Sequence, residues 1–499
     1  MSKNLQLTFL FLLVTPLSTE AKGLDETINN VVRPLADGLQ SFIFFSVPIF
    51  GVDVPLIVFW LIGAGVFFTF YFRFLNILGF VHAIRLVKGD FDSEEDDGEV
   101  NHFQALATAL SGTVGIGNIG GVAILLTLGG PGAIFWMIVA GFLGMSTKFI
   151  ECVLGVKYRN ITADGTVSGG PMYYLEKGLA KRGFTKMGKA LGYFYAVSMV
   201  IGCMGIGNMF QSNQAFEQFV YITGGAESWF SDKGWLFGGV VALLVAGVIL
   251  GGLKSIAKVT SKLVPFMGLS YVGFALVIIA MNMSKVPAAF QAIFTQAFSP
   301  EGITGGVIGV MVLGFRRAAF SNEAGIGSAS IAHSAVKTSE PVTEGYVALL
   351  EPFIDTVVVC TMTALVILTT VYDPSLTGSG VQGIELTAQA FTQNISWSGV
   401  PLSFIAILFA FSTMISWSYY GLKGWTYVFG ASAISENIFK IIFCGFVALG
   451  CMVQLGAVLD FSDAMVFVVA LPNIIGLYIL APIVKKELAS YQQRKVGRI

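Results

Sequence analysis

The sequence predicts an all-α integral membrane protein made of two inverted repeats of five helices, preceded by one extra N-terminal transmembrane helix. Three observations lead to this prediction. Of the 499 residues, 55% are hydrophobic and 12% are charged, whereas soluble domains carry about 25% charged residues. Eleven apolar segments are each long enough to cross a bilayer. Two of them, five apart in order, are interrupted by glycines and polar residues, which indicates paired repeats.

The composition excludes several classes of protein. The five cysteines lie in apolar stretches without paired or CxxC spacing, so we expect neither a disulfide framework nor a metal site built on them. The chain has no basic tract, and we therefore expect no nucleic-acid partner.

The N-terminus has the pattern of a secretory signal peptide, predicted over residues 1–21. Lys3 is followed by the apolar run Leu5–Val14 and then by small residues near Ala21. The alternative is a short anchor that stays attached. Residues 22–52 would then form a periplasmic or interfacial segment.

The spans follow in order along the rest of the chain. The first, over 53–80, is the extra helix; the repeats cover 103–282 and 303–484, and residues 485–499 form a cytoplasmic tail. The expected spans are 53–80, 103–128, 131–158, 190–222, 235–252, 259–282, 303–335, 342–371, 397–422, 437–456 and 461–484.

Lysine and arginine are concentrated in every second loop, and positive loops stay in the cytoplasm. The mature N-terminus is therefore predicted in the periplasm and the C-terminus in the cytoplasm of a bacterial cell (inner) membrane. The residues that set this orientation are Arg85, Lys88, Lys157, Arg159, Lys177, Lys181, Lys254, Lys258, Lys262, Lys337, Lys423, Lys485 and Lys486.

The second span contains the glycine-rich stretch Ser111–Gly121, which includes Thr113 and Asn118. Its GxGxxG spacing is no dinucleotide fingerprint, because no strand precedes it. A helix packed closely through glycines is one interpretation. Polar residues among so many glycines favour unwound backbone with exposed amides and carbonyls.

The seventh span is interrupted over Gly314–Gly327. Charges at bilayer depth need a partner or a cavity, so we interpret this span as a helix broken at mid-membrane; the alternative is a surface loop between two short helices. We expect an Arg–Glu pair, or an arginine bound to an exposed carbonyl, to hold the break. The polar residues are Arg316, Arg317, Ser321, Asn322 and Glu323.

Paired breaks at corresponding places in two halves favour a transporter with its site at the membrane midplane. Helix N-termini and free amides attract a carboxylate, while free carbonyls attract an ammonium group or Na⁺. A zwitterionic amino acid and a cation fit both ends, and the glycines leave room for a small side chain only.

Six motifs carry a family resemblance: Ser111–Gly121, Gly129–Trp136, Gly169–Leu175, Asn208–Gln214, Gly314–Gly327 and Glu351–Thr356. With them the chain resembles the alanine or glycine:cation symporter family over residues 55–485. The resemblance implies sodium-driven uptake of alanine, glycine or D-alanine on a leucine-transporter-like fold. The signal peptide departs from the commoner family pattern.

The resemblance also implies substrate contacts, in the second, fourth, seventh and ninth spans. Trp417 could instead be ordinary packing, and the amides of the fourth span could bond neighbouring helices. The implied contacts are Thr113, Gly117, Asn208, Gln211, Arg317, Ala318, Phe320, Ser321, Asn322, Glu323 and Trp417.

The fold that the resemblance implies has a sodium site between the second and ninth spans. Backbone carbonyls near Gly112 and Gly115 would face the hydroxyls of Ser412, Thr413 and Ser416. The alternative is that these hydroxyls bond their own helix backbone.

The remaining ionisable residues of the spans have structural interpretations. Lys148 and Glu151 are three apart on a helix and are expected to pair. Asp355 would cap or pair, with proton coupling as the alternative. The histidines at 82, 102 and 333 show no metal-binding spacing.

Two other functional classes are less compatible with these residues. No nucleophile–base set or paired histidine motif points to an enzyme, and no cofactor other than Na⁺ as coupling ion is expected. A channel would need charged rings, usually from several subunits. H⁺ in place of Na⁺, the preferred stereoisomer, the stoichiometry and the oligomeric state stay open.

Overall fold

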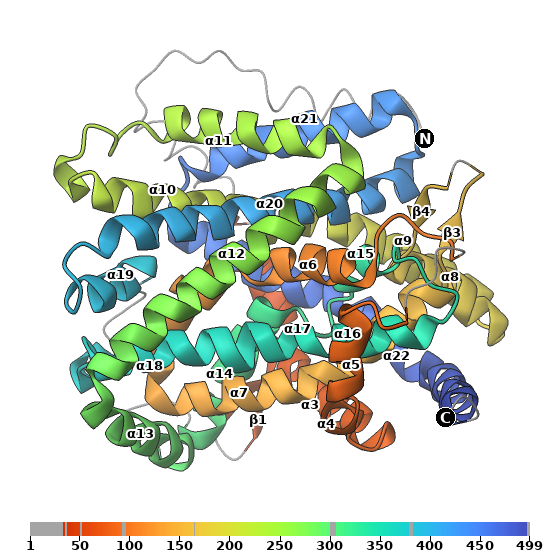
Figure 1. The fold of residues 1–499 in the computed structure, drawn as a ribbon, viewed down its shortest axis with the longest axis horizontal. Helices are drawn as coiled ribbons and strands as arrows, with labels where there is room; N and C mark the ends of the chain where they lie inside the picture. The colour runs from red at the N-terminus through yellow and green to blue at the C-terminus, as the bar shows by residue number, and fades with distance from the viewer. Residues whose placement is uncertain are drawn as a thin grey trace.

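The computed structural model describes residues 33–34, 37–49, 52–91, 96–163, 165–299, 306–378 and 383–496. The predicted signal peptide, residues 1–21, and the last three residues of the tail lie outside this part of the chain. Within it the fold is built almost wholly of helices (Figure 1).

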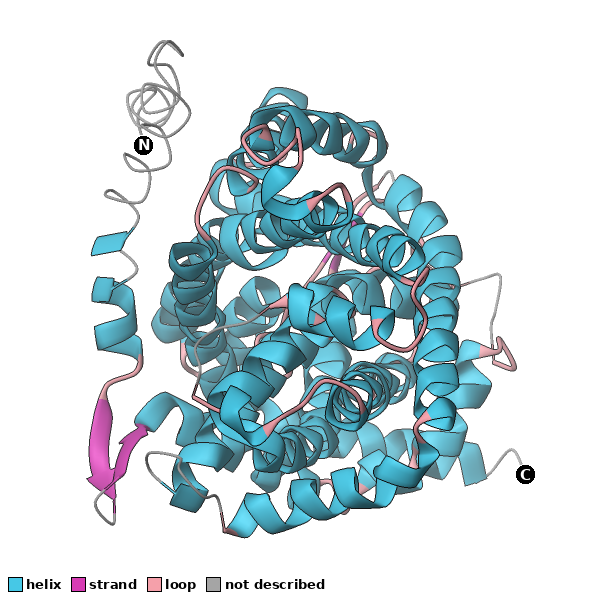
Figure 2. Cartoon of the chain, turned by 90° about the vertical axis from the view of Figure 1, so that its left-hand side faces the viewer, coloured by secondary structure: helices cyan, strands magenta, loops and turns pink. Residues whose placement is uncertain are grey.

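Between residues 46 and 87 the described part of the chain forms a hairpin and three helices. Strands β1 (Ser46–Ile49) and β2 (Val52–Pro55) pair antiparallel, with Ser46 opposite Pro55, and lie at the periphery of the molecule (Figure 2). The helices that follow are α3 (Leu56–Tyr71), α4 (Leu75–Leu78) and α5 (Phe80–Val87).

The first predicted repeat contains the helices up to α12. Its elements are α6 (His102–Thr113), η1 (Ile116–Asn118), α7 (Gly120–Lys157), β3 (Asn160–Ile161), β4 (Val167–Ser168), α8 (Pro171–Lys181), α9 (Thr185–Met204), η2 (Gly205–Met209), α10 (Phe210–Ile222), η3 (Gly225–Glu227), α11 (Gly234–Ile249) and α12 (Gly252–Met281). Within α7, Gly130 has a φ of 64° and precedes Pro131. This kink is the predicted boundary between the second and third spans.

The second predicted repeat, residues 303–484, begins with α14 and ends within α22, whose last turns belong to the predicted tail. The elements after α12 are η4 (Met283–Lys285), α13 (Val286–Phe298), α14 (Gly306–Asn322), α15 (Ala329–His333), α16 (Pro341–Ala348), α17 (Leu350–Pro352), η5 (Phe353–Cys360), α18 (Thr361–Thr369), η6 (Pro374–Leu376), α19 (Ile384–Thr392), α20 (Gly399–Phe429), α21 (Ala433–Gly450) and α22 (Leu455–Val496).

The outer face of this helical body suits lipid. Seven helices among the described residues are long and apolar enough to cross a membrane, and α3 and α11 are shorter apolar helices. Leu243 on α11, Leu269 on α12 and Ile441 on α21 are 76%, 74% and 73% exposed, which an aqueous surface would not favour. The count of eleven crossings and the inverted repeat remain predictions.

The centre of the body holds the two interrupted segments. Helix α14 packs along α7, while α6 packs against both α12 and α20 (Figure 1). The residues of α6 from Ala105 to Thr113 and those of α15 are all buried. Both breaks therefore occur where the chain is enclosed by protein, the only place where irregular backbone is tolerated at membrane depth.

Candidate binding site at the two helix interruptions

The first interruption separates α6 from α7. Val114 is extended, with a ψ of 93°, and a short 3₁₀ turn follows. The Asn118 side-chain carbonyl accepts from the Gly115 amide at 2.8 Å, and Gln211 Oε1 accepts from the Ile116 amide at 3.2 Å. Side chains thus replace the helical hydrogen bonds that the break removes. Glycine is needed at 115, because a Cβ there would lie 2.5 Å from the Thr413 hydroxyl.

The second interruption begins later than the sequence suggested. Residues 314–322 remain helical in α14, and the break occupies the residues between Asn322 and Ala329. It starts at Glu323, which has a φ of 57°, and continues through Gly325 and Gly327 with φ values of 94° and 83°. The expectation of a helix broken inside the protein is met, and that of a surface loop is not, because Glu323 is 2% exposed.

Asp355 connects the two interruptions. The Asn118 amide donates to Asp355 Oδ1 at 2.6 Å and to the Ser321 hydroxyl at 3.1 Å. Ser321 and Thr356 both donate to Asp355 Oδ2, at 2.8 and 2.7 Å. Asp355 therefore pairs with polar side chains of both interruptions, which agrees with the structural role that was one of its two interpretations.

Asp355 lies in a π-helical segment, η5, which follows Pro352 directly. A second π-helical segment, η2, contains Asn208 and precedes Gln211. Such segments widen a helix and are frequent at functional sites. In this chain both lie on helices that contact the interruptions.

Trp417 joins α20 to both interruptions. Its indole N–H donates to the Gly112 carbonyl at 3.2 Å and to Glu323 Oε1 at 3.0 Å. The other Glu323 oxygen accepts from the Ser328 hydroxyl. Glu323 is thus held by neutral donors, so the predicted Arg–Glu pair is wrong.

The two arginines of α14 pair with α22 instead. Arg316 lies 2.9 Å from Asp463 Oδ2, and Arg317 donates to the same oxygen. Asp463 is 3% exposed and stands at the start of an apolar stretch, just after Asp460 and Ser462. An acidic residue inside a predicted span is itself a signal for a buried partner, and this signal could have pointed to Asp463.

The other predicted substrate contacts fall into two groups. Thr113 makes only long bonds, 3.4 Å each, to carbonyls of its own helix. Gly117 lies against Phe320, whose ring would be 3.6 Å from a Cβ at 117. These residues and Gln211 line the first interruption. Asn208 donates to the Phe443 carbonyl of α21 at 2.8 Å, so its side-chain amide bonds a neighbouring helix.

The predicted sodium ligands lie along one seam between α6 and α20. Ser416 donates to the Thr108 carbonyl at 2.9 Å, and Ser111 donates to the Ser412 carbonyl at 2.7 Å. Ser412 and Thr413 also bond the Phe409 carbonyl of their own helix, at 2.9 and 3.0 Å. Ser412 and Thr413 thus follow the alternative interpretation, and of the three predicted hydroxyls that of Ser416 is the one that crosses to α6.

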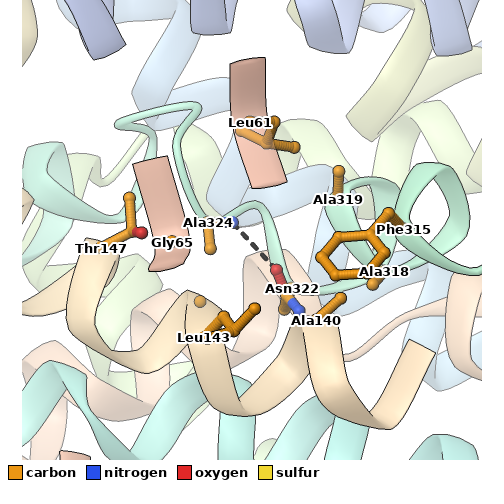
Figure 3. A pocket seen from close by; sticks show the side chains of 11 residues that line it. Leu61, Gly65, Ala140, Leu143, Thr147, Phe315, Ala318, Ala319, Asn322 and Ala324 are labelled. Atoms are coloured by element: carbon orange, nitrogen blue, oxygen red, sulfur yellow. Dashed lines mark hydrogen bonds between the residues drawn. The ribbon is translucent and has the colours of Figure 1, made fainter. Parts of the chain in front are cut away.

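A small cavity lies beside the second interruption, between α3, α7 and α14 (Figure 3). Ala318 lines it, and Asn322 reaches its edge while accepting a hydrogen bond from the Ala324 amide at 3.0 Å. Its walls are otherwise mostly apolar, so it fits a zwitterion poorly. The interruptions are the better candidate site.

Lys148 does not pair with Glu151 as expected. Lys148 Nζ lies 3.2 Å from Glu351 Oε2, whereas Glu151 Oε1 accepts from Asn473 at 2.8 Å. Glu151 is closer to Lys148 in sequence, but the carboxylate that pairs with Lys148 is that of Glu351 from α17. These residues are fully buried.

Comparison with known proteins decides the family. The model of the sodium:alanine symporter family matches residues 40–498. The chain belongs to the sodium:alanine symporter family. It is thus a multi-pass membrane transporter rather than an enzyme, and the resemblance read from its motifs is confirmed.

Relatives of this symporter cover nearly the whole chain. The sodium/alanine symporter AgcS of Methanococcus maripaludis is 40% identical over 442 residues, 88% of this chain and 94% of that protein. The amino-acid carrier protein AlsT of Bacillus subtilis is 34% identical over 441 residues, 88% of this chain and 90% of that protein.

A solved structure shows the fold. The transporter MhsT in complex with L-phenylalanine matches with a TM-score of 0.56 and 15% identity, over 79% of this chain and 99% of that chain. This likeness assigns the symporter a leucine-transporter-like fold, as expected from the sequence.

Proposed function

We propose that this protein is a secondary active transporter that carries a small neutral amino acid, alanine, glycine or D-alanine, into the cell together with Na⁺ by alternating access. The observation that carries the proposal is the hydrogen bonding of the two interruptions through Asn118, Ser321 and Asp355. Two broken helices that are fixed to each other in the protein interior bring helix ends together at one place, which is how transporters of this kind build a binding site.

The substrate would lie against the first interruption. Helix α7 begins there, so its first amides are available to a carboxylate, while the last carbonyls of α6 suit an ammonium group. The Thr113 hydroxyl makes only long hydrogen bonds within its own helix and would therefore be free to bind the substrate. Phe320, 5.1 Å from Phe210 between ring centroids, limits the space for a side chain beyond Gly117.

Sodium would bind at the seam of α6 and α20. Its ligands would be the hydroxyls of Ser412, Thr413 and Ser416 together with carbonyls near Gly112 and Gly115. Binding a cation there would draw α6 towards α20 and so fix the first interruption for the substrate. That linkage gives sodium-dependent binding without a direct contact between the two ligands.

The predicted orientation belongs to the same proposal. The repeats would lie in a bacterial inner membrane with the mature N-terminus in the periplasm and the C-terminus in the cytoplasm. Sodium flowing inward would then drive uptake.

The test is uptake of radiolabelled alanine into proteoliposomes, with Na⁺ or K⁺ outside. We expect accumulation with Na⁺ only, competed by glycine and D-alanine and not by leucine. Equal uptake with K⁺ under a pH gradient would mean proton coupling. Competition by leucine as strong as by glycine would contradict the small pocket.

A further inference from the structure

A line of five ionisable residues runs through the interior beside the second interruption. It consists of His102, Glu344, His333, Glu351 and Lys148, from α6, α16, α15, α17 and α7 in that order. Four of the side chains are 0% exposed and that of His102 is 4% exposed. We call this set the His–Glu chain.

Its central residue is His333, which contacts a carboxylate at each ring nitrogen. Nδ1 lies 2.5 Å from Glu344 Oε1, and Nε2 lies 2.6 Å from Glu351 Oε1. An ionised carboxylate can only accept, and a neutral imidazole has a single N–H. A neutral His333 between two ionised glutamates could therefore make only one of these two hydrogen bonds. Both form only when His333 and the two glutamates together hold one additional proton.

The outer members explain where this proton resides. Lys148 Nζ is bound to the second oxygen of Glu351 at 3.2 Å, and His102 Nδ1 contacts the second oxygen of Glu344. Each carboxylate thus has a donor on either side, which favours its ionised form. With Lys148 and His333 positive and two glutamates negative, the chain is neutral overall, as burial requires.

In the part of the protein that the structure describes, neither a metal ion nor another side chain replaces the positive charge of His333 in the His–Glu chain. Cys152, His333 and Glu351 bring ligand atoms within 4.8 Å of one another, but an imidazolium has no lone pair for a metal ion. The further ionisable groups that interact with members of the His–Glu chain are Cys152 and Glu151 from α7, Arg159 just after it, Glu323 from the second interruption, Asp355 from η5 and Tyr420 from α20.

The position of His333 in the fold links its protonation to the second interruption. Helix α15 is the short helix that follows the second interruption, and Ser328, at its start, holds Glu323. His333 ties α15 to α16 and α17. Loss of the proton would leave one of the two buried carboxylates facing an imidazole lone pair and would loosen α15.

We propose that the His–Glu chain is a proton-binding site, with His333 as its imidazolium, whose occupancy holds α15 in place and makes transport pH-dependent. The dependence on transport rests on the proposed function. The presence of the proton on His333 is independent of the proposed function, so the proton site and its link to transport can be refuted separately.

The proton is tested by nitrogen NMR on protein labelled with ¹⁵N-histidine, which is tractable because the chain has three histidines. Single His→Gln variants at 82, 102 and 333 assign the signals. At pH 8, where an ordinary histidine with a pKa of about 6.5 is neutral, we expect His333 to carry protons on both nitrogens. A neutral His333 at that pH would overturn the proposal.

Glu344→Gln is the sharper variant, because it removes the need for the proton without breaking the hydrogen bonds. The introduced amide can donate to His333 Nδ1 and accept from His102, so that a neutral His333 donates only to Glu351. We expect His333 to become neutral in this variant while the protein stays folded. A doubly protonated His333 in this variant would contradict the donor count.

Transport is tested by sodium-driven alanine uptake between pH 6 and 9. Above its midpoint the protonated fraction falls about tenfold per pH unit, so wild-type uptake should fall at the alkaline end. Glu344→Gln should give a flat profile, and His82→Gln, which changes the histidine outside the chain, should keep the wild-type profile. A Glu344→Gln profile that follows the wild type would refute the link to transport. Wild-type protein with a protonated His333 and no uptake would refute the proposed function and support the proton site.

Discussion

Asn118→Ala should separate transport from stability more clearly than any other substitution. The Asn118 side chain is 0% exposed and connects the Gly115 amide to Asp355 and Ser321. Its removal leaves at least the Gly115 N–H and Asp355 Oδ1 without these partners. At about 1–3 kcal/mol for each buried orphan, the cost is about 2–6 kcal/mol.

The matched control is Asn213→Ala, which removes the same group at 2% exposure. The Asn213 amide donates to the Val453 and Gly450 carbonyls at 2.6 and 3.3 Å, away from both interruptions. Each variant should therefore lower the midpoint of thermal unfolding by a similar amount. Only Asn118→Ala should deform the site.

The assay is alanine uptake in proteoliposomes, normalised to the amount of folded protein measured by fluorescence-detected size-exclusion chromatography. A distortion worth 1.4 kcal/mol changes affinity about tenfold, so uptake by Asn118→Ala at low alanine should fall at least about tenfold relative to Asn213→Ala. Equal uptake by the two variants would refute the reasoning that these hydrogen bonds hold the site together.

Three further predictions follow from the geometry. Asp463→Asn leaves the buried Arg317 and the partly exposed Arg316 without their carboxylate and should cost about 3–5 kcal/mol, mostly through Arg317; the loss is read as a lower midpoint of thermal unfolding, and a wild-type midpoint would contradict it. Thr113→Ala and Gln211→Ala should each weaken alanine binding about tenfold by leaving polar partners unpaired, which isothermal calorimetry would detect, and wild-type affinity in both would remove them from the site. Gly207→Ala would place a Cβ 1.9 Å from the buried Trp417 ring, whereas nothing lies within 4 Å of a Cβ at Gly247; only the first should impair folding, and equal yields of the two would show that the ring can move aside.

The sequence predicted the helices and the two breaks because the signals are local. Apolar length, glycine content and isolated charges within a span are visible in one short stretch. The start of the second break was predicted too early, since Gly314 and the arginines suggested irregular backbone there. Asp463 on α22 holds those arginines, and α14 continues as a helix to Asn322.

The partners of buried charges could not be predicted, because they come from distant segments. Lys148 has Glu151 one turn away, yet it binds Glu351, 203 residues further along. Glu323 similarly lies close to two arginines in sequence but is held by Trp417, 94 residues away. Helix packing decides these pairs, and no local spacing reports it.

The central claim is that inward flow of sodium and of a small amino acid is coupled in one molecule. Its most direct test is ²²Na⁺ entry into proteoliposomes, measured with and without external alanine. We predict that alanine accelerates ²²Na⁺ entry, that Na⁺ accelerates alanine entry, and that Asn118→Ala reduces both together. Alanine entry that leaves ²²Na⁺ entry unchanged would contradict the account.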